Sequence, residues 1–460
     1  MRQSTSQRHQ AQRGRHMRRR GSLALRPVAV GAAALGLTVG MLGAGAGIAG
    51  ASAGTTKGTA VYKYAQYVGG HGKANQKLSP VTIGIVNQQT ATNAVAPVWT
   101  TGADIAAEYL NQHTHGIDGH PVKLELCKIA TSASTASKCG QQFSDDSKVT
   151  AIAAGPITVG NTALETALLP SGKPLVWSVS LSASDEKFKD GFILQGAITQ
   201  VEAPLATFGY KYLHAKTVSI VYQANIPTEV EGATTIDDAL SYQGVKTIYK
   251  VGFTAADTNF SVPFEAAHVA TTTLTILVNS GGPGCSDAYL TLKSLGLATK
   301  VKMLANVPCV TPTIAKADGG TLPHDWYYGA ANPLPGSPTK SVTVFDKIAA
   351  HYGHPTTGPN VWVANAFGQV LTIAKWDTQL LKAHKKLTTK NVMQKARSFK
   401  GPVAQGAGTR HIDCGSLSTL PAVCDSLVSF FENTAPNKFT PIAWYIGPPK
   451  GFKAPVTSTG

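Results

Sequence analysis

A unit of strand, polar loop and amphipathic helix recurs along this chain from Val81 onward, and it constrains the fold more than any other feature. Apolar runs at residues 81–86, 149–154, 174–177 and 217–222 each lead into a loop of small and polar residues. Strands that alternate with helices form parallel sheets. Such sheets bind ligands at the carboxyl ends of their strands. The sequence therefore predicts an α/β fold whose function lies in the strand-end loops.

The first 53 residues differ from the rest and have the pattern of an export signal. Residues 1–27 contain eight arginines and no acid, and residues 28–50 form an uninterrupted small and apolar run. Residues 51–53 have the Ala-x-Ala form of a signal-peptidase site. We predict a cleaved signal peptide over 1–53 and a secreted or cell-surface protein. The alternative is an uncleaved anchor, because such a run can span a bilayer. No cysteine precedes Cys127, so a lipid anchor at the usual cysteine is not expected.

Length and composition indicate a folded protein of two α/β lobes. The chain has 460 residues, of which 43% are apolar and 14% charged, so disorder is not expected. Eight of the sixteen net positive charges lie in the predicted signal. The remaining lysines are scattered, and the dense run at 382–390 is typical of a solvated helix end. No nucleic-acid partner is expected.

Six cysteines in an exported chain suggest disulfides. Fifteen pairings are possible, and pairing between neighbours is favoured because each such pair brackets one turn or one strand–helix step. A zinc site is not expected, since no Cys-x-x-Cys occurs and no histidine has the matching spacing. The favoured pairs are Cys127 with Cys139, Cys285 with Cys309, and Cys414 with Cys424.

The sequence predicts a leader, two lobes and a tail. Residues 54–79 are predicted to be a flexible leader, and 448–460 a frayed tail. Lobe 1 is predicted over 80–198 and 327–387, and lobe 2 over 199–326 and 388–447. Expected helices are 98–110, 201–213, 342–352, 361–382 and 392–398; expected later strands are 122–127, 246–251, 274–278, 301–304 and 441–446.

The succession of motifs in the first lobe resembles a known family. Residues 81–86 are followed by 102–111, then by the Gly-Ile-Asp-Gly-His-Pro-Val turn at 116–122, then by 151–156. This order resembles the type I periplasmic binding proteins, and among them the leucine/isoleucine/valine-type substrate-binding proteins of ABC transporters. The resemblance covers about residues 80–450. It implies two Rossmann-like lobes with parallel-type sheets flanked by helices, joined by a multi-strand hinge, which close on a small ligand without altering it.

The chain also departs from that family. The family's acidic residue after its second strand is replaced by Cys127 and Lys128. Its amino-acid binders hold the ligand ammonium with a carboxylate from a loop of lobe 2, and the matching segment 306–309 contains no acid. These departures put an amino-acid ligand in doubt.

The strand-end loops point to a polar site without charged side chains. The segments 87–93, 155–161, 178–184, 223–228, 279–284 and 306–311 contain no Asp, Glu, Lys or Arg. Backbone N–H groups and hydroxyls can hold a carboxylate, whereas a buried ammonium would lack a charged partner. Glu229, Glu231 and Asp287, at the loop margins, are the acids that could supply one.

This composition favours a neutral or mildly anionic ligand, of the amino-acid-like, amide or small-carboxylate kind. The alternatives stay open: Thr158 and Asn161 can instead cap a helix, the alternating serines can form a plain polar surface, and Tyr222 and Trp326 can pack in the core. The predicted ligand-binding residues are Gln88, Thr90, Gly155, Thr158, Asn161, Ser178, Ser180, Ser182, Tyr222, Asn225, Asn279, Ser280 and Asn306.

We therefore predict an extracytoplasmic solute-binding protein that acts as a monomer, uses no cofactor and delivers its ligand to a membrane ABC permease complex. The alternative is a ligand sensor or scaffold on the same fold. An enzyme is not expected: residues 281–286 resemble a segment of serine carboxypeptidases, but the Gly-x-Ser-x-Gly nucleophile motif is absent. His113, His115 and His120 are expected at the surface, not at a metal.

Overall fold

Five buried strands pair in parallel to form the first sheet of the computed structural model, in the order β2-β1-β3-β4-β5. The whole of β1 is buried, as expected for a parallel sheet covered by helices on both faces. The strands of this sheet are β1 (Val81–Gln88), β2 (Val122–Ile129), β3 (Val149–Ala154), β4 (Leu175–Trp177) and β5 (Gly191–Ile193).

The structure describes residues 61–89, 98–130, 132–177, 179–194, 196, 198–254, 256–257, 259–278, 282–310, 312–320, 322–324, 326–331, 334, 337–353, 361–404, 412–435 and 438–452. The predicted signal peptide lies outside these residues. Among the described helices, none combines the length and the apolar character needed to cross a bilayer.

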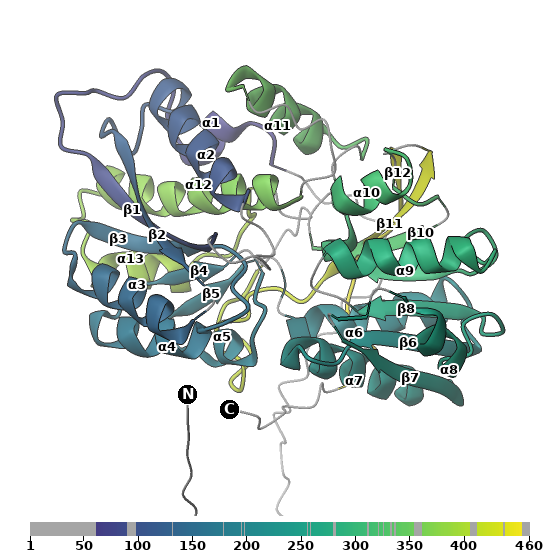
Figure 1. Ribbon diagram of the computed structural model, residues 1–460. Helices are drawn as coiled ribbons and strands as arrows, with labels where there is room; N and C mark the ends of the chain where they lie inside the picture. Colours follow the sequence, from purple (N-terminus) through teal and green to yellow (C-terminus); the bar gives the residue numbers. More distant parts are fainter. Residues whose placement is uncertain are drawn as a thin grey trace, which may run out of the picture. The chain divides into compact units, whose positions relative to one another are not determined.

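Helices cover both faces of the first sheet (Figure 1). One face packs with α2 and α12, and the other with α3 and α4. Helix α12 also contacts α1, α13 and β3, and it is buried along nearly its whole length, which explains its almost continuous apolar sequence. The helices of this region are α1 (Tyr64–Val68), α2 (Trp99–His113), α3 (Ala133–Asp145), α4 (Asn161–Leu168), α5 (Ala183–Lys187), α11 (Lys340–His351), α12 (Val361–Lys382) and α13 (Thr389–Arg397), with the 3₁₀ turn η1 (Leu169–Ser171).

The second sheet has seven strands in the order β12-β11-β10-β9-β8-β6-β7. Its first five strands along the chain pair in parallel, whereas β11 and β12 form an antiparallel hairpin added at the β10 edge. The strands are β6 (Thr217–Gln223), β7 (Thr247–Phe253), β8 (Leu274–Val278), β9 (Met303–Asn306), β10 (Trp326–Ala330), β11 (Val428–Ala435) and β12 (Lys438–Ile446).

The helices that accompany the second sheet pack in pairs, α6 with α7 and α9 with α10. Phe208 of α6 stacks on Phe430 of β11 with ring centroids 4.0 Å apart. These elements are α6 (Ile198–Lys211), α7 (Pro227–Tyr242), α8 (Ser261–Ala266), α9 (Gly282–Ser294), α10 (Pro312–Ala317) and the 3₁₀ turn η2 (Val307–Cys309).

The predicted α/β class, with sheets flanked by helices, is confirmed. Helix α12 has the bounds expected from the sequence. The structure adds three strands that the sequence analysis did not identify: β5, β10 and β11. Strands β5 and β10 are short, and β11 contains polar residues that interrupt its pattern of apolar residues.

The predicted division into lobes differs from the sheets in two places. The boundary at 326/327 falls inside β10, whose residues pair with β9 in the second sheet. Residues 388–447 are not one part of lobe 2, because α13 packs on α12 and β3 of the first sheet. Val423 also bridges to Ile193 of β5. The chain therefore returns to the second sheet only at β11.

The described part of the predicted flexible leader is ordered and packed. Tyr64 is 1% exposed; its hydroxyl donates to the carbonyl oxygen of Ser341 (3.1 Å), and its ring meets that of Phe367 edge-on. The hydroxyl of Tyr67 hydrogen-bonds to the hydroxyl of Thr372 and to the carbonyl oxygen of Pro402. The first residues of the predicted frayed tail, 448–452, are also packed, because Phe452 is buried against the second sheet. Aromatic side chains that bury their rings hold both segments in place.

The six cysteines form three disulfides between neighbours along the chain. Cys127–Cys139 joins β2 to α3, Cys285–Cys309 joins α9 to η2, and Cys414–Cys424 closes the loop before β11. The second of these bonds anchors the turn that follows β9.

Replacing Tyr64 with alanine is expected to destabilise the protein by about 3–5 kcal/mol, because a fully buried aromatic ring and its hydrogen bond are lost. Chemical denaturation measures the change. The matched control is Gln66→Ala, an exposed position in the same helix, which should change stability by less than about 0.5 kcal/mol. A small, equal effect of both substitutions would contradict the packing described for α1.

Candidate functional site

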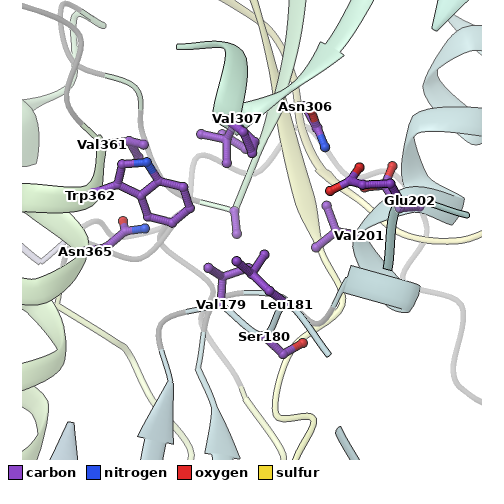
Figure 2. Close-up of a pocket in the computed structure, with 15 residues that line it drawn as sticks. Val179, Ser180, Leu181, Val201, Glu202, Asn306, Val307, Val361, Trp362 and Asn365 are labelled. Atoms are coloured by element: carbon purple, nitrogen blue, oxygen red, sulfur yellow. The ribbon is translucent and has the colours of Figure 1, made fainter. Parts of the chain in front are cut away.

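A pocket is lined by residues that belong to elements of both sheets (Figure 2). The first sheet contributes the loop after β4 and the first turn of α12. The second contributes the start of α6, one residue of α7, the end of β9 with η2, and the end of β10. The lining residues are Val179, Ser180, Leu181, Val201, Glu202, Glu229, Asn306, Val307, Pro308, Gly329, Ala330, Ala331, Val361, Trp362 and Asn365.

The pocket has an apolar wall and a polar end. Trp362, Val361 and Asn365 lie on one side, and Glu202 and Asn306 lie on the other. The pocket contains about 590 Å³ of space, part of it open to solvent. That size, with mostly apolar walls and a few polar groups, is typical of a small-molecule site.

Parallel-strand geometry places Asn306 in this pocket. It is the last residue of β9, a central strand of the second sheet, and η2 begins directly after it. The carboxyl end of a central parallel strand is where such sheets present side chains to ligands. The Cys285–Cys309 disulfide then fixes η2 to α9, so the segment that lines the pocket is held at both ends.

Glu202 is a buried acid of the pocket wall. It is 1% exposed and interacts with the Asn306 side chain, and its Oε2 has no hydrogen-bond partner in the described part of the chain. Burial, and secondly the charge of Glu229, raise the pKa of Glu202 to about 8. The carboxyl is therefore largely protonated at neutral pH.

Two of the predicted ligand-binding residues line this pocket, Ser180 and Asn306. Ser180 is fully buried and its hydroxyl donates to Glu186 at 3.4 Å. Thr90, Ser178, Asn279 and Ser280 lie outside the described residues. For these the ligand-binding role stays a prediction.

The other predicted residues do not line this pocket, and several have structural partners. Gln88 accepts from both the backbone N–H and the hydroxyl of Thr158 (3.0 and 2.9 Å). Asn161 donates to Asp185 at 2.8 Å and caps no helix, because Gly160 occupies the N-cap position. Long-range polar pairs, and not helix caps, thus account for Thr158 and Asn161.

The remaining predicted positions lie away from the pocket lining. Ser182 is the N-cap of α5 and accepts from the N–H of Ser184. Gly155 packs closely against Asn87, where a Cβ would collide with the side-chain oxygen. Tyr222 packs against the core of the second sheet, and Asn225 is exposed in the turn after β6.

Trp326, His115 and His120 have structural surroundings away from the pocket lining. Trp326 is buried in the core beside Tyr289. His115 and His120 hydrogen-bond to carbonyl oxygens of residues 73 and 79. Within the described residues no cluster of three or more His, Cys, Asp or Glu could hold a metal ion.

Sequence reasoning missed Glu202 and Trp362. Glu202 lies in the first turns of α6, in a segment without a clear pattern, and Trp362 is the second residue of a helix far along the chain. Neither belongs to a strand-end loop. The strand-end segments contain no acid, but the pocket has two: Glu202, which the sequence analysis did not select, and Glu229, one of the three acids it named at the loop margins.

Comparison with known proteins identifies the family to which the chain belongs. The model of the family described as "Periplasmic binding protein" matches residues 80–414, so the chain belongs to the periplasmic binding proteins. No curated protein matches the sequence significantly. The family and its solved relatives are solute-binding proteins of ABC transporters, not enzymes.

Solved structures show the same fold at low sequence identity. LivJ, the branched-chain amino acid transporter substrate-binding protein of Streptococcus pneumoniae, solved with isoleucine, is 16% identical, with a TM-score of 0.62 over 80% of this chain and 100% of that one. A fatty acid ABC transporter substrate-binding protein from Thermomonospora curvata is 13% identical (TM-score 0.66; 84% and 97%). A solute-binding protein from Rhodopseudomonas palustris HaA2, in complex with p-hydroxybenzoic acid, is 14% identical (0.66; 81% and 99%).

The raised pKa of Glu202 predicts how stability depends on pH. The folded protein keeps a proton that the unfolded chain releases above its ordinary pKa of 4.5. The contribution of Glu202 to stability therefore falls as pH rises from about 4.5 to about 8 and is constant above, by at most about 1.4 kcal/mol per pH unit. Glu202→Gln removes this loss, so the variant gains on the wild type as pH rises through that range.

Urea unfolding of both proteins at several pH values measures this difference, and the contributions of groups that do not interact with Glu202 cancel. A difference between variant and wild type that does not change with pH would show that Glu202 titrates normally.

Proposed function

We propose that the chain is the solute-binding component of an ABC importer, which captures a small molecule in this pocket and delivers it to a membrane permease. The observation that carries this proposal is that elements of both sheets line one pocket. Membership of the periplasmic binding proteins supports it. Export by the predicted signal peptide and action as a monomer belong to the same proposal.

A ligand in this pocket contacts both sheets at once. Leu181 and Trp362 belong to elements of the first sheet, whereas Val201 and Val307 belong to elements of the second. A molecule that touches both sets favours the arrangement in which they are close together, and it shifts the population toward that state. This closed state is what a permease would recognise as loaded.

The lining narrows the ligand class. Its apolar wall suits an apolar body, and the Glu202–Asn306 end suits a polar group. Of the three expected classes, amino-acid-like and amide ligands offer N–H donors to carboxyl oxygens. A small carboxylate is disfavoured at this end, because Glu202 and Glu229 are acids and no described lining residue is Lys, Arg or His. The relatives solved with isoleucine and with p-hydroxybenzoic acid show that members of this fold differ in cargo.

A thermal-shift screen of amino acids, amines, amides, sugars and small carboxylates tests the function. A true ligand at about 100 times its Kd stabilises the folded state by about 2.7 kcal/mol and raises Tm by several degrees. Trp362→Ala should weaken its binding at least about tenfold, because the aromatic wall is lost. The control Leu290→Ala, at an exposed position of α9, should bind normally. The proposal is contradicted if no compound stabilises the protein, or if Trp362→Ala binds the active compound as tightly as the wild type.

A further inference from the structure

The carboxyl of Glu202 is buried in the pocket wall with only part of its hydrogen-bonding capacity used. It is 1% exposed, and within the described residues Oε2 has no hydrogen-bond partner while the side chain interacts with Asn306. An ionised carboxylate in such surroundings is costly unless a cation or several donors face it. Without a bound cation, burial therefore keeps Glu202 protonated.

Within the described residues, the ionisable group whose charge acts on Glu202 is Glu229 on the facing helix α7. Glu229 is fully buried and lines the pocket. Glu231, 9% exposed, follows on the same helix but does not line it. Gly232 makes room for Glu202, because a Cβ there would lie 3.1 Å from its Cγ. An ionised Glu202 would thus face the charge of Glu229 across the contact between α6 and α7.

The other lining residues that the structure describes carry no charged side chain. The loop after β4 contributes Val179, Ser180 and Leu181, the end of β10 contributes residues 329–331, and α12 contributes Val361, Trp362 and Asn365. Val307 and Pro308 complete the lining beside Asn306. Among the described lining residues, both ionisable groups are therefore carboxyls, and they lie opposite a largely apolar wall.

We propose that the pocket takes a solute with a cationic amine and an apolar body, and that its ammonium group replaces the proton carried by Glu202. This inference rests on the proposed function, since the cargo occupies the same pocket. The solute enters as an ammonium ion, the O–H bond of Glu202 breaks, and the proton passes to solvent. One positive charge enters and one leaves, so the net charge of the pocket is unchanged.

The apolar wall excludes a bare inorganic cation as the natural cargo. An ion at the Glu202–Asn306 end would leave Trp362, Val179 and Leu181 without a contact on the opposite side. A solute with an aliphatic or aromatic body fills that space and removes apolar surface from water. The two ends of the pocket therefore select for one molecule that has both features.

Proton exchange gives a definite pH dependence. Burial and Glu229 hold the pKa of Glu202 at about 8 when no ligand is bound, so each bound ammonium releases about one proton at lower pH. Affinity should rise about tenfold per pH unit below that pKa and become constant above it. A ligand that is neutral or anionic releases no proton.

A matched set of four compounds tests the exchange: leucine, 3-methylbutylamine (leucine without its carboxyl group), 4-methylpentanoate (leucine without its amine) and 4-methylpentanamide. Titration calorimetry in two buffers of different ionisation enthalpy counts the protons released. The two amines should bind with release of about one proton near neutral pH. The acid and the amide should bind at least about tenfold more weakly.

Two variants make the test specific. Glu202→Gln should bind the amines at least about tenfold more weakly, release no proton and show no pH dependence. Asp377→Asn is the matched control, because Asp377 is also a fully buried acid, with a pKa raised by burial to about 7, but it bonds to Thr150 in the first sheet and does not line the pocket. This control should bind and release protons as the wild type does. Proton counts on the wild type and Asp377→Asn decide the question even if Glu202→Gln fails to fold.

The outcomes separate this inference from the proposed function. Amine binding without proton release, or equally tight binding of the amide or the acid in a Trp362-dependent manner, overturns the proton exchange and leaves the solute-binding function intact. If none of the four compounds binds and the broad thermal-shift screen also finds no ligand, the function itself is contradicted.

Discussion

Burial of α12 is the constraint on which the rest of the structure depends. This helix packs against α1, α2, α13 and β3. Its contact with α2 is so close that a Cβ at Gly102 would collide with the carbonyl oxygen of Val363. A helix held on so many sides cannot rotate freely. Its first turn therefore presents Trp362 and Asn365 to the pocket in a fixed orientation.

Opposite this rigid wall, the pocket has a polar end whose buried acids lower the stability of the folded protein. Glu202 and Glu229 are acids in a buried environment, where hydrophobic side chains would give greater stability. Proteins retain such groups mainly at functional sites. The same logic applies less directly to Asp377, whose carboxyl bonds to Thr150 in the interior of the first sheet, away from the pocket. Because Asp377 does not line the pocket, a ligand in the pocket cannot offset the free-energy cost of burying its carboxyl.

Periodicity predicted most of the fold because parallel strands are continuous apolar runs whose helices follow at once. It did not identify β11, where Ser429, Glu432 and Asn433 interrupt the apolar pattern. It also misjudged residues 61–79, because the ordering of α1 depends on distant partners in α11 and α12 and not on local propensity. Cysteine spacing favoured the pairing that the structure contains, since each bond closes a short loop.

The site was less predictable than the fold. The strand-end rule selected Asn306, which lines the pocket. It also selected Thr158 and Asn161, which hydrogen-bond to Gln88 and Asp185 instead. These partners lie far away in sequence. Glu202 and Trp362 come from helix starts, which carry no sequence signal of a pocket, and they meet only because two sheets contribute to one site.

The central claim is that one bound molecule contacts elements of both sheets. Amide hydrogen exchange of the protein, measured with and without the tightest compound of the screen, tests it most directly. Binding should slow exchange in two groups of segments together: 179–181 and 361–365 from the first sheet, and 201–203 and 306–309 from the second. Slower exchange in one group alone, or only at segments outside the pocket, would contradict the account.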